Sequence, residues 1–329
     1  MGNKVSTYFR SHRQIHGKLK HSPHLPAVLQ AVFVTILWAS SWVLIKFGLR
    51  ASLPALTFAG LRYVLAFLCL APFVLLSSRN RATIKSFTKK DWGRLTLLGI
   101  IFYTFTQGSQ FLSLAYLPAA MVSLMLNLTP LVVGLFGIAF LREYPSITQW
   151  FGIALTVIGV TVYFLPVGME SVAAIGLLVA LGGVVSNAAS ALLGRQVNRL
   201  ANTSPLIITF ISMGIGSLFL LLIGIATQGF GNLDLQAWML IAWLAVVNTA
   251  IAFTLWNHTL RTLSAVESSI INSLMMPQIA ILAYLFLGET LIVREILGLV
   301  LVGLGVMVVQ LRKRSSLPQA SPATESNAD

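Results

Sequence analysis

The sequence predicts an all-α integral membrane protein whose ten transmembrane helices form two inverted five-helix repeats. Its composition is the first observation, because 57% of the 329 residues are hydrophobic, only 9% are charged, and the mean hydropathy is +0.85. Soluble domains carry about 25% charged residues. The other two observations are a series of long apolar stretches and a residue pattern that occurs twice.

The apolar stretches give the helices in order. A membrane-spanning helix needs about 20 mainly apolar residues. Five stretches fill the first half of the chain, at 27–49, 55–77, 94–114, 118–141 and 146–166. Five more fill the second half, at 173–195, 204–226, 237–259, 264–287 and 292–311. We therefore expect a basic N-terminal tail (1–26), a first repeat (27–166), a second repeat (173–311) and a disordered C-terminal tail (312–329).

The duplicated pattern is a glutamate followed by two glycines and a valine, and its second copy lies 146 residues after the first. The pairs are Glu143 and Glu289, Gly152 and Gly298, Gly159 and Gly305, and Val160 and Val306. Each unit has an odd number of helices, so the second must enter the membrane upside down. Inverted repeats are typical of secondary transporters, whose substrate site lies near the bilayer midplane.

The distribution of basic residues predicts the orientation. With the N-terminus inside, 18 of the 22 Lys and Arg residues fall in cytoplasmic segments. The positive-inside rule therefore places both termini in the cytoplasm of a multi-pass protein of the plasma membrane. The net charge of +13 follows from this topology and from attraction to anionic lipid, so no nucleic-acid partner is expected.

Several motifs resemble a known family. They are Trp38-Ala-Ser-Ser-Trp-Val-Leu-Ile-Lys46, Phe58-Ala-Gly-Leu-Arg62-Tyr63, and the paired Pro130…Glu143 and Pro277…Glu289. In this order they are similar to the EamA domains of the drug/metabolite transporter superfamily. The resemblance covers roughly residues 28–311. It implies a ten-helix carrier, most often an exporter of amino acids, other metabolites or drugs, with a cavity lined by helices 1, 3, 4, 6, 8 and 9.

Charges inside the bilayer are costly and often functional. Arg62 lies about 12 Å below the outer end of helix 2, at 1.5 Å per residue, and no Asp or Glu falls in the middle of a span. Arg62 is therefore satisfied either by backbone carbonyls, polar side chains or water, or by an anionic group of a substrate. Lys46 is about 6 Å from the outer end of helix 1 by the same rise, close enough to reach the lipid headgroups.

Polar residues recur at helical spacing on several spans. Tyr103, Gln107 and Gln110 share one face of helix 3 at i, i+4 and i+7. Each amide has an ordinary role in hydrogen bonds between helices, but together they favour a shared polar cavity. The expected substrate-binding residues are Trp38, Ser41, Trp42, Arg62, Tyr103, Gln107, Gln110, Asn127, Asn187, Ser190, Asn248, Trp256 and Asn272.

A second group of residues is expected to control gating or coupling. Proline inside a helix frees a carbonyl and bends the axis, so helices 4 and 9 are candidates for kinks. His258 titrates in the useful pH range, although a histidine at an interface is commonly structural. Without an acid in mid-span, we expect weak or absent proton coupling, which would make the protein a facilitator, and the sequence leaves proton coupling open as the alternative. The group is Lys46, Pro130, Pro277, His258, Glu143 and Glu289.

These features predict a carrier that exports small organic metabolites, such as amino acids, by alternating access. The alternatives are an exporter of drugs or other cationic compounds with the same fold and a membrane-embedded enzyme acting on lipid-linked substrates. No cluster of catalytic residues supports an enzyme, and neither a cofactor nor a metal site is expected. The glycines of helices 5 and 10 leave a homodimer open, because small residues allow helices to approach closely.

Overall fold

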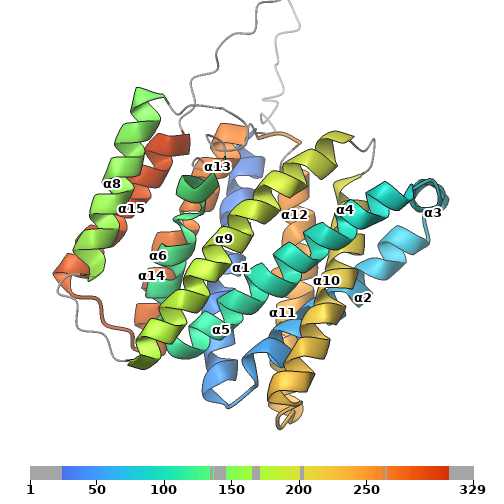
Figure 1. Ribbon diagram of the computed structural model, residues 1–329, viewed down its shortest axis with the longest axis horizontal. Helices are drawn as coiled ribbons and strands as arrows, with labels where there is room; N and C mark the ends of the chain where they lie inside the picture. The colour runs from blue at the N-terminus through green and yellow to red at the C-terminus, as the bar shows by residue number, and fades with distance from the viewer. Residues whose placement is uncertain are drawn as a thin grey trace, which may run out of the picture.

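The computed structural model describes residues 24–133, 136, 146–164, 171–200, 204–259, 261–263 and 265–310. All regular elements in these ranges are helices. The start of the first helix and the end of the last lie on the same side of the molecule, at the top of Figure 1. The predicted tails 1–26 and 312–329 lie almost entirely outside the described residues.

Each predicted span of the first repeat corresponds to one or more helices. Spans 3 and 4 are composite, because span 3 contains a π-helical segment and span 4 is interrupted after its first two turns. The elements are α1 (His24–Arg50), α2 (Ala55–Leu75), α3 (Ser78–Lys85), α4 (Lys89–Gly99), η1 (Ile100–Gln107), α5 (Gly108–Tyr116), α6 (Ala119–Leu126) and α8 (Ile147–Phe164).

The second repeat has the same construction. Its third span again contains a π-helical segment, and its fourth is again broken. The elements are α9 (Ser171–Leu200), α10 (Pro205–Gln228), α11 (Leu235–Ala245), η2 (Val246–Ile251), α12 (Ala252–Thr259), α13 (Ala265–Ser273), α14 (Met275–Leu287) and α15 (Val293–Gln310). Seven helical stretches are by themselves long and apolar enough to span a bilayer, which is consistent with ten spans once the broken and shorter helices are included.

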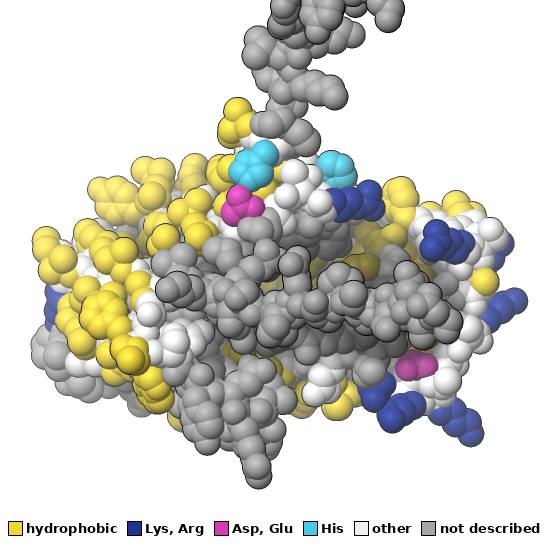
Figure 2. All heavy atoms as spheres, turned by 90° about the horizontal axis from the view of Figure 1, so that it is seen from above, with side chains coloured by type: hydrophobic (Ala, Val, Ile, Leu, Met, Phe, Trp, Pro, Cys, Tyr) yellow, Lys and Arg dark blue, Asp and Glu magenta, His cyan; other side chains and the backbone are white. Residues whose placement is uncertain are grey.

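The sequence did not predict α3. This short helix connects spans 2 and 3, and Ser77 caps its N-terminus by accepting a hydrogen bond from the backbone N–H of Asn80. It carries Arg79, Arg81 and Lys85 and buries no residue. Basic side chains gather at the end of the molecule where α3 lies, whereas hydrophobic side chains cover the opposite end, over α8 and α15 (Figures 1 and 2). The position and charge of α3 fit the membrane surface.

Helix packing follows the inverted repeat. Each span of one repeat has a counterpart in the other, and the counterparts make similar contacts. Helix α1 packs against α11, η2 and α12, and its counterpart α9 packs against their counterparts α4, η1 and α5. The contacts of α1 with α13 and α14 likewise correspond to those of α9 with α6. The pairs α2–α10 and α8–α15 map onto themselves. The five-plus-five arrangement predicted from the sequence is therefore also the arrangement of the packed helices.

The two π-helices reproduce the sequence offset. The first begins at Ile100 and the second at Val246, which are 146 residues apart, like the duplicated glutamates and glycines. A π-helix inside an α-helix is rare and is frequently found at a functional site. Its presence at the same place in both repeats indicates that the distortion belongs to the repeat itself.

The duplicated glycines join the fifth helix of one repeat to the fifth of the other. A Cβ atom added to Gly152 would lie 2.8 Å from the carbonyl oxygen of Gly305, and one added to Gly159 would lie 2.7 Å from the backbone nitrogen of Val302. The reverse contacts, from Gly298 to the Gly159 oxygen and from Gly305 to the Gly152 oxygen, are equally close. Because this glycine face is buried between α8 and α15 of one chain, it does not provide the dimer surface considered from the sequence (Figure 1).

We expect Gly159→Ala to destabilise the protein, because the added methyl would press against the backbone of α15 at a distance that real Cβ atoms essentially never show. Overpacking of this kind costs about 1–3 kcal/mol. The measurement is the midpoint of thermal unfolding in detergent, which should fall. Gly182→Ala is the control, since a Cβ atom there meets nothing within 4 Å. Equal midpoints for the two variants would contradict a tight α8–α15 contact.

Candidate functional site

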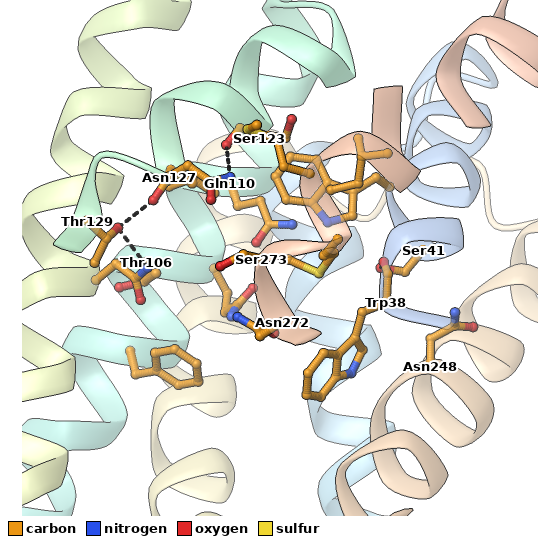
Figure 3. Close-up of a pocket in the computed structure, with 18 of the residues that line it drawn as sticks. Trp38, Ser41, Thr106, Gln110, Ser123, Asn127, Thr129, Asn248, Asn272 and Ser273 are labelled. Atoms are coloured by element: carbon orange, nitrogen blue, oxygen red, sulfur yellow. Dashed lines mark hydrogen bonds between the residues drawn. The ribbon is translucent and has the colours of Figure 1, made fainter. Parts of the chain in front are cut away.

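A polar cavity of about 410 Å³ lies in the middle of the helix bundle. Figure 3 shows side chains of both repeats pointing into it, among them Trp38 and Ser41 from α1, Gln110 from α5, and Asn272 and Ser273 from α13. Helices 1, 3, 4, 6, 8 and 9 all contribute, as the family resemblance implied. Helix 2 also contributes, through Arg62 and Tyr63, and helix 10 does so through Val306.

Ten of the thirteen residues expected to bind substrate line this cavity. They come from helices far apart in the sequence, which supports the inference that the polar stripes face a common space. They are Trp38, Ser41, Trp42, Arg62, Gln107, Gln110, Asn127, Asn187, Asn248 and Asn272.

Arg62 is the charged group in the cavity wall. Its side chain is only 4% exposed, and its Nε donates a 3.1 Å hydrogen bond to the hydroxyl of Thr249 in η2. The guanidinium carbon lies 5.2 Å from the ring centre of Tyr63 and 5.8 Å from that of Phe111, within the range of cation–π attraction. In the part of the chain that the structure describes, no Asp or Glu pairs with Arg62. Its charge is therefore offset by one hydroxyl and two aromatic rings, with the cavity in front of it.

The π-helical segment of span 8 supplies the partner of Arg62. The Thr249 hydroxyl donates to the carbonyl of Leu244, five residues earlier, which is the residue spacing of a π-helical turn. The oxygen of this hydroxyl then accepts from Arg62. The distortion thus orients the hydroxyl that holds the guanidinium.

The cavity amides are only partly satisfied by the protein. The Nδ2 of Asn187 donates to Thr129 at 3.1 Å, joining α9 to helix 4, and the Oε1 of Gln107 accepts from the Tyr63 hydroxyl at 2.7 Å. Asn248 donates through Nδ2 to the Leu37 carbonyl and to the Ser40 hydroxyl, but its buried Oδ1 has no partner among the described residues. These amides therefore bind neighbouring helices and also leave polar atoms for a ligand.

Aromatic side chains form one wall of the cavity. The ring of Trp38 lies 5.4 Å from that of Phe253 and 5.1 Å from that of Trp256, centre to centre. Trp38 and Phe253 line the cavity, whereas Trp256 packs behind Trp38. The expectation for Trp256 is corrected accordingly: it supports the wall without lining it.

Tyr103 and Ser190 are also placed away from the cavity. Spacing in an α-helix would put Tyr103 on the face of Gln107, but η1 covers both residues, and its wider turn rotates Tyr103 out of that face. Tyr103 is 3% exposed and packs against Tyr63 and Phe102. The hydroxyl of Ser190 is used within its own helix, donating to the Asn187 carbonyl at 2.8 Å.

The cavity includes residues that the sequence analysis did not select. Most are apolar or are small alcohols, which carry no signal of their own in a membrane helix. Four of them had a signal from their neighbours: Ser123 lies in the polar stripe of helix 4, Ser273 and Met276 lie on the same side of helix 9 as Asn272, and Tyr63 follows Arg62. The set is Tyr63, Phe102, Thr106, Ser123, Leu126, Thr129, Phe253, Ser273, Met275, Met276, Ile279 and Val306.

The expected gating residue Glu289 joins the two repeats at one end of the bundle. Its carboxylate accepts hydrogen bonds from the backbone N–H groups of Ala119, at 2.8 Å, and Ala120, at 3.3 Å. These are the first residues of α6, where unsatisfied N–H groups and the helix dipole favour a negative charge. Lys46 is half-buried nearby, and its ammonium is attracted by the Glu289 charge.

Lys46 and Arg50 lie at the same end of the bundle as Glu289. They line a second cavity of about 380 Å³, together with residues of the α1–α2 connection and α5. Arg50 also donates to the Leu287 carbonyl at 2.9 Å, which ties the last turn of α1 to the end of α14. Lys46 therefore lies against protein groups, although its position near the helix end had allowed it to extend to the headgroups.

Breaks in helices 4 and 9 lie close to the two prolines. Helix 4 is interrupted at Asn127 and Leu128, just before Pro130, and helix 9 at Leu274, three residues before Pro277. A proline lacks the N–H that would close the preceding turn, which accounts for the position of both breaks. Of the other gating candidates, His258 is exposed near the end of α12, and Glu143 lies outside the described residues.

The opposite end of the bundle has a different kind of contact. The imidazole Nε2 of His24 lies 2.8 Å from the carboxylate of Glu267, which joins the start of α1 to α13. Both side chains are about half exposed. Contacts between exposed charged or polar groups contribute little to stability, so we expect this one to be weaker than the part-buried cap formed by Glu289.

Comparison with known proteins agrees with this architecture. The chain is 26% identical over 313 residues to the uncharacterized transporter YvbV of Bacillus subtilis, covering 94% of this chain and all of that protein. It is also 26% identical over 304 residues to a probable terminal-alkyne amino-acid exporter of Streptantibioticus cattleyicolor, covering 91% of this chain and 97% of the relative. A solved crystal structure at 15% identity matches with a TM-score of 0.60, over 86% of this chain and 97% of that one, which supports the fold alone.

The sequence pattern of the EamA-like transporter family matches twice, over residues 25–165 and 174–311. The two matches follow the two halves of the inverted repeat. This family consists of membrane transporters, so the enzyme alternative is set aside. The chain belongs to the EamA-like transporter family and contains two EamA domains.

Proposed function

We propose that this transporter exports small zwitterionic or anionic metabolites, amino acids foremost, across the plasma membrane by alternating access. Arg62 carries the proposal, because a buried guanidinium in a cavity wall without a carboxylate partner among the described residues is suited to receive the carboxylate of a substrate. The unpartnered Oδ1 of Asn248 is an acceptor in the same cavity and suits an ammonium group.

Two further observations support amino acids. The described cavity wall contains no acidic side chain, so a cation would meet the charge of Arg62 without a counter-ion. The Streptantibioticus relative is named a probable amino-acid exporter. The rings of Trp38 and Phe253 do favour the drug or cationic-compound alternative, since aromatic faces attract cations, but Arg62 in the same cavity opposes it.

In the proposed cycle, the contacts of Glu289, Lys46 and Arg50 close the outer end of the cavity. Helices 4 and 9 bend at their breaks beside Pro130 and Pro277 when that end opens. The orientation follows the positive-inside bias, with both termini in the cytoplasm. Because no Asp, Glu or His lines the described cavity wall, we expect exchange to change little with pH between 6 and 8.

Arg62→Gln tests the proposed substrate contact. Purified protein in proteoliposomes is loaded with unlabelled amino acids, and uptake of labelled external amino acid is followed. A hydrogen bond to a charged group is worth about 1.5–3 kcal/mol, so the half-saturation concentration should rise by roughly ten- to a hundredfold. Arg79→Gln on α3, an exposed arginine outside the cavity, is the control. A folded Arg62→Gln protein with unchanged kinetics would show that Arg62 only supports the helices.

Glu289→Gln tests the proposed outer closure. The neutral amide caps α6 less well and loses its attraction to Lys46, so the outer end should open more often. A single cysteine at Ser41, in a Cys69→Ser background, reports access from outside by its rate of labelling with a membrane-impermeant maleimide. We expect severalfold faster labelling than in the parent. Glu295→Gln is the matched control, because the hydrogen bond of Glu295 caps its own helix, through the N–H of Ile292.

If Glu289→Gln labels at the rate of the parent while substrate exchange is intact, Glu289 has a structural role and does not act as a gate. If Glu295→Gln accelerates labelling equally, the effect is a general loosening of the α14–α15 connection. Either result would remove Glu289 from the proposed cycle without affecting the role of Arg62.

A further inference from the structure

A large apolar groove of about 680 Å³ lies between α14 and α15. Its floor includes Ala280 and Leu299, each 7% exposed, and no charged side chain lines it among the described residues. Its rim includes Ile281, Tyr284 and Val300, which are 58%, 59% and 52% exposed. These rim residues belong to spanning helices, so the groove opens toward the acyl chains of the bilayer.

The groove meets the polar cavity at the break of helix 9. Ser273 and Met276 line both spaces, one on each side of the interruption at Leu274. Gly303 of α15 faces this point, since a Cβ atom there would lie 3.3 Å from the methyl carbon of Met276. The flexible, unbranched side chain of Met276 therefore stands between an apolar space open to lipid and a polar space that contains Arg62.

We propose that the groove holds the apolar tail of an amphipathic substrate whose amino-acid head occupies the central cavity. This inference rests on the proposed function, and it names the substrate class as α-amino acids with a long unbranched alkyl chain. Such a molecule enters sideways from the bilayer, with its tail passing Met276. The groove's length suits a chain, because the lining residues of α14 from Met276 to Leu285 extend over about 14 Å at 1.5 Å per residue.

The chemistry of the two spaces supports a divided ligand. A lipid-facing groove gives a hydrocarbon tail surroundings as apolar as the bilayer, so the tail moves there without a solvation cost. A zwitterionic head cannot stay in hydrocarbon, but it finds the guanidinium of Arg62 and the Asn248 Oδ1 in the connected cavity. A resident phospholipid chain or a second copy of the protein would also fit an apolar face, but neither accounts for the shared wall at Ser273 and Met276.

The test compares amino acids that differ only in chain length. Norvaline, norleucine, α-aminooctanoic acid and α-aminodecanoic acid compete against labelled norvaline in the counterflow assay. Two variants alter the groove without changing a residue of the cavity wall: Gly303→Leu fills its junction with the cavity, and Val300→Asn makes its exposed rim polar. Leu297→Asn is the control, because Leu297 is 54% exposed on the same helix but does not line the groove.

In the parent protein, we expect the half-inhibitory concentration to fall with each added methylene. In Gly303→Leu and Val300→Asn, the half-inhibitory concentration of α-aminodecanoic acid should rise by about tenfold, which is the effect of losing roughly two buried methylenes. The half-inhibitory concentration of norvaline should stay unchanged. Leu297→Asn should behave like the parent, which separates the groove from simple partitioning of long chains into lipid. Val300→Asn gives the answer on its own if Gly303→Leu does not fold.

The outcomes distinguish the two proposals. Identical chain-length profiles in the parent, the groove variants and the control would overturn the tail site while leaving an amino-acid carrier intact, and co-purified phospholipid would then identify the occupant. A change in norvaline inhibition equal to that of the long chain would also overturn it, because the groove would then act on the fold. If no amino acid exchanges at all, the proposed function fails first.

Discussion

Every polar group that this chain places inside the bilayer must be satisfied by the protein or by a ligand, because lipid hydrocarbon offers no hydrogen bonds. Most hydroxyls of the spanning helices meet this constraint by donating to a carbonyl of the preceding turn, as Thr35 and Ser123 do. Two exceptions lie at the site. The guanidinium of Arg62 faces the cavity beyond its bond to Thr249, and the Oδ1 of Asn248 has no described partner. Where the protein leaves polar atoms unsatisfied, a polar ligand has something to bind.

The same constraint explains where the helices are irregular. Both π-helices and both broken helices contribute residues to the cavity wall, where hydroxyls and amides are available to backbone groups. The α8–α15 pair, on the outside of the bundle, has continuous helices and a glycine contact too close for any side chain. The fold thus separates the closely packed α8–α15 pair, where the backbones touch, from the central cavity, where irregular helices bring the polar groups together.

The sequence predicted much of this architecture for identifiable reasons. Helix count and inverted duplication depend on hydropathy and on a register of 146 residues, which are properties of the chain itself. The cavity residues were found where polar types are rare and therefore informative, as for Arg62 and Asn127.

Other features could not be predicted from the sequence. Tyr103 was misplaced because the periodicity argument assumes an α-helix, and no residue pattern in Ile100–Gln107 indicates the wider turn. The contact of Glu289 with Ala119 joins residues 170 apart, and only the folded chain brings them together. The short, basic α3 has too few apolar residues to give a hydropathy signal.

The cap on α6 has a consequence for the origin of the protein. Glu289 belongs to the second repeat, and the helix that it caps belongs to the first. A half-length chain with this glutamate and this helix start would have to find its partner in another molecule inserted in the opposite direction. The glycine contact between α8 and α15 also requires a partner half, since each glycine of α8 lies against one of α15. Within one chain the two halves form this antiparallel pair by themselves, and positions related by the 146-residue offset can differ, as Arg62 and Ile208 do.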